Sequence, residues 1–258
     1  MIYKTLTVTE EDGIGIITLN RPTLMNALNA QMRAEITAAV RDLGARMRVL
    51  VLTGEGRAFC SGQDLGDGAA VSEIDLGRIL REEYEPMLRA IYDCPVPVIS
   101  AVNGAAAGAG ANLALAADVV IAAQSAVFLQ AFTRIGLIPD AGGTYWLPRL
   151  TGFARAMGQA LFAEPVTAEE AARTGLIWAA VPDDEFAAHW RKRAAQLAKG
   201  PTLAYGAVKR ALRASMVNDL DAQLDVEARL QEEMGATRDF REGVMAFLEK
   251  RPARFEGR

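Results

Sequence analysis

The chain has 258 residues, a formal net charge of −4 at pH 7, 51% hydrophobic residues and 23% charged residues. This length and composition predict one large α/β domain, or such a domain with a small helical appendix. The slight acidity argues against a general binder of nucleic-acid backbones, which would carry a clear basic excess.

The first part of the chain combines predicted strands and helices. A hairpin is expected over residues 6–20, with its turn at Asp12 and Gly13. A helix is expected over residues 29–43, with Asn29 as its N-cap. Four further elements follow: a buried strand over residues 48–54, a helix over residues 73–93, a buried strand over residues 95–104 and a small-residue helix over residues 108–118.

A strand over residues 119–124 continues this order, and the chain becomes wholly helical from about Pro201. The succession of strand, strand and helix, with glycine-rich turns after the strands, predicts stacked ββα units. Amphipathic stripes mark the helices after Pro201, and no linker separates them from the rest. We therefore expect a core in residues 1–200 and a C-terminal helical region in residues 201–258 that packs against the core or a neighbouring subunit.

Several functional classes are excluded by residues that the sequence lacks. The one histidine, His189, lies in a predicted helix with a polar face, so neither a histidine-rich metal site nor a Ser-His-Asp triad is expected. Cys60 and Cys94 form no C-x-x-C pair, which favours a reducing, cytoplasmic setting. The sequence predicts neither a signal peptide nor a membrane span.

Two glycine-rich turns follow predicted strands, in "FCSGQDL" (residues 59–65) and "AVNGAAAGAG" (residues 101–110). A tight turn that needs glycine for its backbone conformation would explain either one alone. The second is not a dinucleotide-binding fingerprint, because Leu113 stands where the third glycine would be. If the fold brings the turns together, their backbone N–H groups would stabilise one developing oxyanion.

Asp140 stands in "GLIPDAGGT", residues 136–144. Asp is a favoured N-cap, and residues 141–150 predict a helix, so capping is one interpretation. Apolar neighbours such as Ile138 and Trp146 favour a second interpretation. A desolvated carboxylate has a raised pKa, which suits a base that accepts and returns a proton. The sequence leaves both open.

Taken together, these motifs resemble the crotonase (enoyl-CoA hydratase/isomerase) superfamily. "NRP…NAL" (residues 20–28), "FCSGQDL", "NGAAAGAG" and "GLIPDAGGT" occur in that family's order and spacing, and the resemblance covers nearly the whole chain. It implies an α/β fold of the ClpP/crotonase-like kind, a spiral of ββα units with a C-terminal helical region. It also implies a homotrimer, or a homohexamer built as a dimer of trimers.

The same resemblance implies an acyl-CoA thioester substrate, with coenzyme A as part of the substrate and no separate cofactor or metal. It implies neither nucleic acid nor membrane as a partner. The backbone N–H groups of Gln63 and Ala109 would form the oxyanion hole for the thioester carbonyl. The residues implied to bind CoA or substrate are Met25, Ala27, Cys60, Ser61, Gly62, Asp64, Leu65, Gly108, Asn112, Phe132 and Gly136.

Two departures from the family pattern narrow the reaction. The family's hydratases use two glutamates to add water, and this chain has Asn112 and Phe132 at those positions. Asp140 stands where the family's isomerases carry their acid/base carboxylate. An acyl-CoA isomerase with Asp140 as catalytic residue is therefore expected.

The leading substrate is the ring epoxide of phenylacetyl-CoA, which would be converted to the corresponding oxepin. An apolar pocket near Phe128, Phe132 and Trp146 would suit its six-carbon ring. The alternatives are a general 3-enoyl to 2-enoyl-CoA isomerase and a non-catalytic acyl-CoA-binding subunit. The conformation of residues 66–84 over the site is left open.

Overall fold

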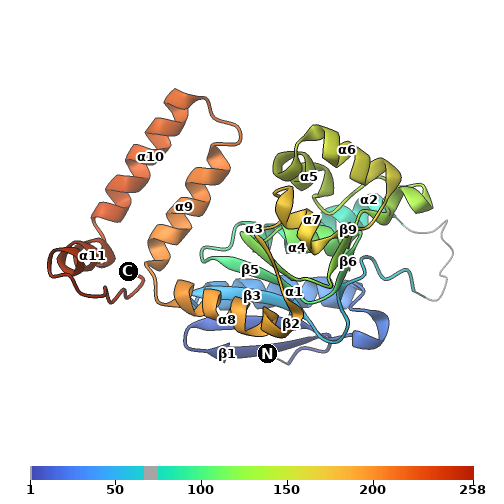
Figure 1. Ribbon diagram of the computed structural model, residues 1–258, viewed down its shortest axis with the longest axis horizontal. Coiled ribbons are helices and arrows are strands. Elements are labelled where there is room, and N and C mark those ends of the chain that lie inside the picture. Colours follow the sequence, from blue (N-terminus) through green and yellow to red (C-terminus); the bar gives the residue numbers. More distant parts are fainter. Residues whose placement is uncertain (1, 67–74) are drawn as a thin grey trace.

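The computed structural model describes residues 2–66 and 75–258, and it confirms the predicted α/β fold (Figure 1). Within these residues, a six-stranded sheet has the order β1-β2-β3-β5-β7-β10, and a four-stranded sheet has the order β4-β6-β8-β9. The strands are β1 (Leu6–Glu11), β2 (Ile14–Leu19), β3 (Val49–Gly54), β4 (Ala58–Cys60), β5 (Val98–Val102), β6 (Ala105–Ala107), β7 (Val119–Ala123), β8 (Val127–Leu129), β9 (Val166–Thr167) and β10 (Ala179–Val181).

Consecutive strands divide between the two sheets, which produces the predicted ββα spiral. The first strand of each pair β3/β4, β5/β6 and β7/β8 joins the large sheet, and the second joins the small sheet. Strands β4, β6 and β8 are parallel neighbours, as are β3, β5 and β7. The carboxyl ends of β4, β6 and β8 therefore lie along the same edge of the small sheet.

Helices cover both faces of the large sheet. The helical elements are η1 (Pro22–Leu24), α1 (Ala30–Gly44), α2 (Leu76–Ile79), η3 (Leu80–Tyr84), α3 (Glu85–Tyr92), α4 (Ala109–Leu115), η4 (Ala131–Ile135), α5 (Gly143–Thr151), α6 (Phe153–Phe162), α7 (Ala168–Arg173), α8 (Asp183–Ala198), α9 (Thr202–Ala214), α10 (Leu220–Gly235) and α11 (Arg238–Leu248). The predicted cap is confirmed, because the Asn29 side chain accepts a hydrogen bond from Met32 N at 2.9 Å.

Alternation along β3 explains the layers. Its residues Leu50 and Leu52 point into the main core, which also contains the inner face of α1. The intervening Val49 and Val51 belong to a second cluster with α8, whose Trp190 is 5% exposed. A strand buried on both faces reads as a continuous apolar run, which is why the sequence predicts it well.

The helix expected over residues 73–93 differs from the prediction. Residues 73 and 74 lie outside the described part of the chain. From Leu76 to Tyr92 the element begins as α-helix, widens to a π turn in η3, and returns to α-helix in α3. The π turn is marked by a hydrogen bond from Glu85 N to Leu80 O. We call α2, η3 and α3 together the wall helix.

Helices α9, α10 and α11 extend to one side of the two sheets (Figure 1). A buried charge cluster anchors α9 to the core: Lys209 Nζ and Arg213 Nη2 each lie 2.7 Å from a carboxylate oxygen of Asp118. Lys209 Nζ also donates to the carbonyl oxygen of Cys94 at 2.7 Å. This extension follows the end of α8 at Ala198; the division of the chain at residue 200 stays a prediction.

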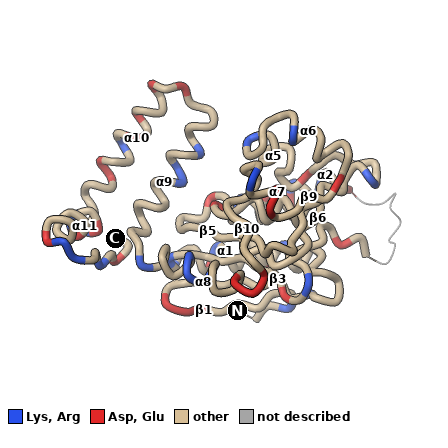
Figure 2. Tube along the Cα trace, viewed as in Figure 1, with Lys and Arg blue, Asp and Glu red and all other residues tan. Residues whose placement is uncertain are grey.

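Charged residues of both signs are interspersed along the described chain (Figure 2). Arg46, for example, lies between Glu10 and Asp42, and Arg251 between Glu242 and Glu249. No helix in the described residues is long and apolar enough to cross a membrane.

Candidate active site

Three of the four predicted functional segments follow strands of the small sheet, and the fourth, residues 20–28, follows β2 of the large sheet. The Gly62 turn follows β4, the Gly108 turn follows β6, and the segment that leads to Asp140 follows β8. Because β4, β6 and β8 are parallel neighbours, the segments after them emerge at one edge. The sheet order therefore brings together residues that lie far apart in the sequence.

The two glycine-rich turns are in contact. A Cβ atom on Gly62 would lie 2.8 Å from Ala107 O and 3.5 Å from Ala109 N. A Cβ atom on Gly110 would lie 2.3 Å from Cys60 O. Gly62 also has φ of +100°, a conformation that favours glycine. Glycine is required here for close approach of two backbones, besides the tight turn that the sequence suggests.

The N–H of Gln63 points away from the strand-like segment beside it. Leu28 forms a parallel bridge with Gln63, in which Leu28 N donates to Gly62 O at 2.8 Å and Asp64 N donates to Leu28 O at 3.1 Å. In such a parallel bridge Leu28 bonds to the residues before and after Gln63, and not to Gln63 itself. The N–H of Gln63 therefore points away from Leu28, to the other side. That side is the one where Ala109 begins α4.

Ala109 is the first residue of α4, and its N-cap is Gly108 with φ of +53°. The first N–H groups of a helix have no partner within the helix, and they carry the positive end of its dipole. The resemblance implies that the amides of Gln63 and Ala109 form a pair of backbone donors, and this pairing stays a prediction. Their role towards a thioester carbonyl stays a prediction.

Asp140 does not cap α5, so that interpretation is wrong. The helix begins at Gly143, two residues later than expected, and its N-cap is Gly142, which has a left-handed backbone with φ of +83°. The side chain of Asp140 is half-buried, and its Oδ1 is buried with no hydrogen-bond partner in the described residues. Desolvation raises the pKa of Asp140 to about 6.

Asn112, which the resemblance places at the position of the first hydratase glutamate, holds the Asp140 segment in place. Its Nδ2 donates to Asp140 O at 2.7 Å, and its Oδ1 accepts from Gln130 Nε2 at 2.9 Å. Asn112 is fully buried, and Gly143 packs so closely that a Cβ atom there would lie 2.4 Å from Asn112 Nδ2. Asn112 therefore ties α4, which carries Ala109, to the loop that carries Asp140.

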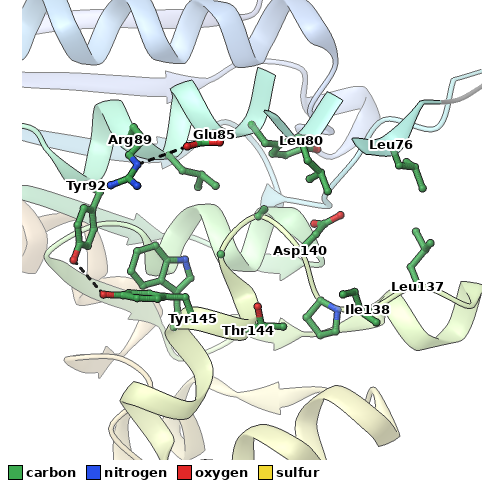
Figure 3. A pocket seen from close by; sticks show the side chains of 16 residues that line it. Leu76, Leu80, Glu85, Arg89, Tyr92, Leu137, Ile138, Asp140, Thr144 and Tyr145 are labelled. Atoms are coloured by element: carbon green, nitrogen blue, oxygen red, sulfur yellow. Dashed lines mark hydrogen bonds and ion pairs between the residues drawn. The ribbon is translucent and has the colours of Figure 1, made fainter. Parts of the chain in front are cut away.

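Asp140 faces a cavity of about 790 Å³ between the wall helix and the segment around the start of α5 (Figure 3). In Figure 3 the Asp140 carboxylate points from its loop towards Leu80 on the opposite wall. Side chains from both walls line this cavity: Leu76, Leu80, Tyr84, Leu88, Tyr92, Leu137, Ile138, Thr144, Tyr145 and Trp146. The surroundings of the carboxylate are thus mostly apolar and aromatic.

The aromatic residues of this cavity are only partly those predicted. Trp146 lines it, but Phe128 lies in β8 within the main core, 2% exposed. Phe132 is buried in η4, with its Cζ 3.8 Å from the place of a Cβ on Gly108. Instead, Tyr92 and Tyr145 stand beside Trp146, with ring centroids 5.5 Å and 4.7 Å from its own.

The other predicted binding residues lie around the two turns. The backbone of Met25 is left-handed (φ +48°), and its carbonyl oxygen accepts a hydrogen bond from Ser61 N at 3.0 Å. Asp64 forms a 2.7 Å ion pair with Arg21, and this hydrogen bond lowers the pKa of Asp64. Asp64 therefore stays ionised and is a structural partner. Three others divide by burial: Ala27 and Cys60 are buried, and Leu65 is 63% exposed.

Two predicted residues remain. Burial raises the pKa of the Cys60 thiol to about 12, so it packs as a neutral side chain. Gly136 ends η4 in a left-handed conformation and turns the chain towards Asp140. Part of the segment 66–84, whose conformation was left open, lies outside the described residues, and its last part forms the start of the wall helix.

The sequence reasoning missed Arg33, Tyr84 and Gln130. Each is buried and hydrogen-bonded to a site residue: Arg33 and Tyr84 to Gln63, and Gln130 to Asn112. The sequence signal for Arg33 was its position, because this charged residue lies on the mostly apolar face of α1. In the described residues, no group of His, Cys, Asp and Glu side chains could hold a metal ion.

Comparison with known proteins gives consistent family descriptions. A family model described as "Enoyl-CoA hydratase/isomerase" matches residues 9–258. A Rhodobacter capsulatus protein named "Probable enoyl-CoA hydratase" is 67% identical over 258 residues, which is 100% of both chains. An Escherichia coli protein named "1,2-epoxyphenylacetyl-CoA isomerase" is 46% identical and covers 96% of this chain and 97% of its own.

The solved structures agree with this result. A crystal structure of an enoyl-CoA hydratase from Bacillus anthracis superposes with a TM-score of 0.91 at 31% identity, over 99% of this chain and 100% of that one. An enoyl-CoA hydratase from Polaromonas sp. JS666 gives the same TM-score and identity over 97% of this chain.

Proposed function

The chain belongs to the enoyl-CoA hydratase/isomerase family, and on this premise we propose that it is an acyl-CoA isomerase with Asp140 as its acid/base. The proposed leading substrate is the ring epoxide of phenylacetyl-CoA, with the oxepin thioester as product. The relative named for that epoxide isomerisation shares 46% of its residues with this chain. The description of the family, enoyl-CoA hydratase/isomerase, implies an acyl-CoA substrate for either reaction.

One observation carries the proposal: Asp140 is a desolvated carboxylate, without a partner for Oδ1, at the wall of an apolar and aromatic cavity. A carboxylate in such a place has a pKa near neutrality and can both take up and release a proton. Glu85 also borders the cavity, but its side chain is 60% exposed and pairs with Arg89.

Addition of water would need groups that the two hydratase positions lack. Asn112 is neutral and uses its amide atoms in hydrogen bonds to the Asp140 carbonyl and to Gln130. Phe132 is apolar and buried. Among the described residues of the cavity, Asp140 is then the carboxylate proposed to transfer protons. A single carboxylate suffices for isomerisation, because the proton removed is returned to the same molecule.

The proposed mechanism transfers one proton through Asp140. The ionised carboxylate removes a proton from the carbon α to the thioester carbonyl, and the Gln63 and Ala109 N–H groups stabilise the resulting enolate oxygen. Protonated Asp140 then delivers the proton to the γ carbon, so the double bond moves into conjugation. For the ring epoxide, opening of the bond shared by the two rings accompanies the same transfer, and no atom is gained or lost.

The test is a product assay by mass and absorbance on two substrates, the ring epoxide and a 3-enoyl-CoA. The proposal expects isomers of unchanged mass, with the epoxide turned over more efficiently. Asp140→Asn should bind CoA esters and lose isomerisation. Full turnover by this variant would exclude Asp140 as the acid/base, and rapid hydration of crotonyl-CoA would contradict the assignment of Asn112 and Phe132.

A second candidate is a general 3-enoyl to 2-enoyl-CoA isomerase. The observation in its favour is the aliphatic part of the cavity, where Leu76 and Leu80 face Leu137 and Ile138 (Figure 3). Such a surface suits an alkyl chain as well as a ring. Greater efficiency on the 3-enoyl-CoA in the same assay would support it, and absence of turnover on both substrates would favour a non-catalytic binder.

A further inference from the structure

The side chain of Gln63 has a role separate from that of its backbone N–H. Its Oε1 accepts hydrogen bonds from Tyr84 Oη at 2.5 Å and from Arg33 Nη1 at 2.9 Å, and its Nε2 donates to Asp64 O at 3.1 Å. Both acceptor positions of the carbonyl oxygen are thus occupied by protein groups. The side chain is therefore a fixed connection between the turn and its surroundings.

Arg33 holds this connection from α1. It is 3% exposed, and its Nη1 also donates to Leu28 O at 2.7 Å, the carbonyl that accepts from Asp64 N. Its Nη2 lies 2.5 Å from Glu83 Oε2 on the wall helix. One buried guanidinium thus contacts the bridge beside the oxyanion turn, the Gln63 side chain and the wall helix.

Tyr84 belongs at the same time to the cavity and to this network. It lines the cavity together with Leu80 and Leu88, one step of four residues to either side. Burial raises the pKa of its phenol, and the negative charge of Asp140 adds to the rise, so the hydroxyl remains a hydrogen-bond donor. The Arg33 guanidinium lies 4.8 Å from the centroid of the Tyr84 ring.

The π turn places Tyr84 in this position. The cavity residues Leu76, Leu80, Tyr84, Leu88 and Tyr92 recur at every fourth position. In an α-helix each such step overshoots a full turn by about 40°, so the stripe would rotate by about 160° from end to end. The wider turn in η3 takes up part of this rotation, and π turns occur frequently at functional sites.

We propose that Arg33, Gln63 and Tyr84 form a latch that fixes the direction of the Gln63 N–H by tying the oxyanion turn to the wall of the acyl cavity. The proposal rests on the proposed function, which assigns that N–H to the thioester oxygen. Arg33, Tyr84 and the Gln63 side chain are positioning groups. Because Tyr84 both lines the acyl cavity and bonds to Gln63, the wall of the cavity influences the donor geometry.

Two variants open the latch. Tyr84→Phe removes one oxygen atom, and Gln63→Met removes the acceptor while it leaves the backbone N–H. The readout is the infrared carbonyl stretch of bound crotonyl-CoA, labelled with ¹³C at the thioester carbon, since donors in the oxyanion hole lower its frequency. Both variants should lose part of this lowering. With the isomerisation substrate, kcat should fall about tenfold, the effect of one hydrogen bond, while KM changes much less.

Tyr92→Phe is the matched control for the spectrum. It also removes a hydroxyl from the cavity wall, but this hydroxyl contacts Tyr145 Oη at 3.4 Å and not Gln63. The carbonyl frequency should therefore stay as in the unaltered protein. In the double variant Tyr84→Phe/Gln63→Met, the carbonyl frequency should rise no further than in Gln63→Met alone, because both changes break the same connection.

An unchanged carbonyl frequency in folded Tyr84→Phe would overturn the proposed latch. A frequency shift in the double variant that equals the sum of the two single shifts would also overturn it. Thermal unfolding tests whether each variant is folded. If Gln63→Met does not fold, the carbonyl frequency of Tyr84→Phe decides the question. The spectrum needs only a bound thioester and no turnover. A protein that isomerises neither substrate would thus contradict the proposed function while the latch is still tested.

Discussion

Asp140 differs from Asp64 and Asp118 because its Oδ1 is buried without a hydrogen-bond partner in the described part of the chain. Asp64 is paired with Arg21, and Asp118 lies between Lys209 and Arg213. The hydrogen bond from Arg21 lowers the pKa of Asp64. The charges of Lys209 and Arg213 oppose the rise that burial causes in the pKa of Asp118. Among the described residues no cation opposes burial at Asp140, and burial raises its pKa to about 6. Groups that are useful in proton transfer are often costly to the fold in this way.

The first prediction concerns the pH dependence of turnover. Asp140 must be ionised in the free enzyme to remove a proton, so kcat/KM should fall as the pH decreases through about 6 and level off above it. The measurement is a pH–rate profile with the isomerisation substrate. A profile that is flat between about pH 5 and 8 would contradict a base of this pKa.

Ionisation of Asp140 should favour turnover but lower the stability of the fold. Its pKa is raised in the folded state, so protonation favours folding, and this contribution is lost as the pH rises through about 6. Asp140→Asn should accordingly raise Tm relative to the unaltered protein at pH 8 and leave it nearly unchanged at pH 4. An equal difference at both pH values would mean that Asp140 titrates normally.

A second prediction concerns Asn112. Asn112→Asp keeps the shape but removes the Nδ2 donor to Asp140 O and places an acid in a fully buried position. We expect kcat to fall at least about tenfold, and the midpoint of the pH–rate profile to rise. Asn103→Asp, an equivalent change at a residue that binds Gly54 and Gly56, is the control and should leave that midpoint in place.

The sequence indicates Asp140 and the two glycine-rich turns more clearly than the side chains that hold them in place. Asp140 and the turns at Gly62 and Gly108 carry their signal in a few adjacent residues, through glycine and proline. The contacts of Arg33 and Tyr84 with Gln63 join residues 30 and 21 positions apart. Such contacts depend on helix rotation in three dimensions, and nothing in the local sequence of Arg33 encodes its partner.

At the scale of elements, the close contact between the β4 and β6 turns is the critical feature. Gly110 lies in α4, where alanine would ordinarily be favoured by about 1 kcal/mol. Here its Cβ would lie 2.3 Å from Cys60 O and 2.7 Å from Cys60 Sγ. Packing and not backbone conformation therefore requires glycine at this position.

The third prediction follows from this contact. Gly110→Ala should push the two turns apart, lower the free energy of unfolding and reduce turnover more than about tenfold. Gly158→Ala in α6 is the control, because its nearest neighbour would be Phe162 Cδ2 at 3.9 Å, and it should stabilise by about 0.5–1 kcal/mol. Urea unfolding and turnover measure both; equal behaviour of the two variants would contradict the contact.

The elements themselves were predictable where one pattern dominated. The strands β3, β5 and β7 are apolar runs, and α1 has its cap and its stripe. The start of α5 was misplaced, because Ala141 and Gly142 form a left-handed turn before the helix, which begins at Gly143. The π turn in the wall helix was not predicted, since residues 80–84, "LREEY", are ordinary helix formers.

At the scale of the whole molecule, the C-terminal helices carry an apolar surface. Phe240 is 53% exposed, Phe247 82% and Leu248 68%, and these helices border a groove of about 700 Å³. Large exposed apolar patches usually mark interfaces. We propose that this surface packs against another copy in a homotrimer or a dimer of trimers.

The fourth prediction tests this assembly. Phe247→Asp changes a side chain that the monomer leaves exposed, so the fold should persist while the oligomer dissociates. Sedimentation velocity should give a trimer or hexamer for the unaltered protein and smaller species for the variant. Arg241→Asp, at an exposed position of the same helix, is the control. A monomeric unaltered protein would contradict the proposal.

The parallel order of β4, β6 and β8 also has a consequence for folding kinetics. Gln63, Ala109 and Asp140 meet only after strands separated by long stretches of chain have paired, and such non-local contacts form slowly. The helices, in contrast, need only local contacts. During refolding from denaturant, helical circular dichroism should therefore return before the proposed isomerase activity, which should appear only when the last of the three strands has paired.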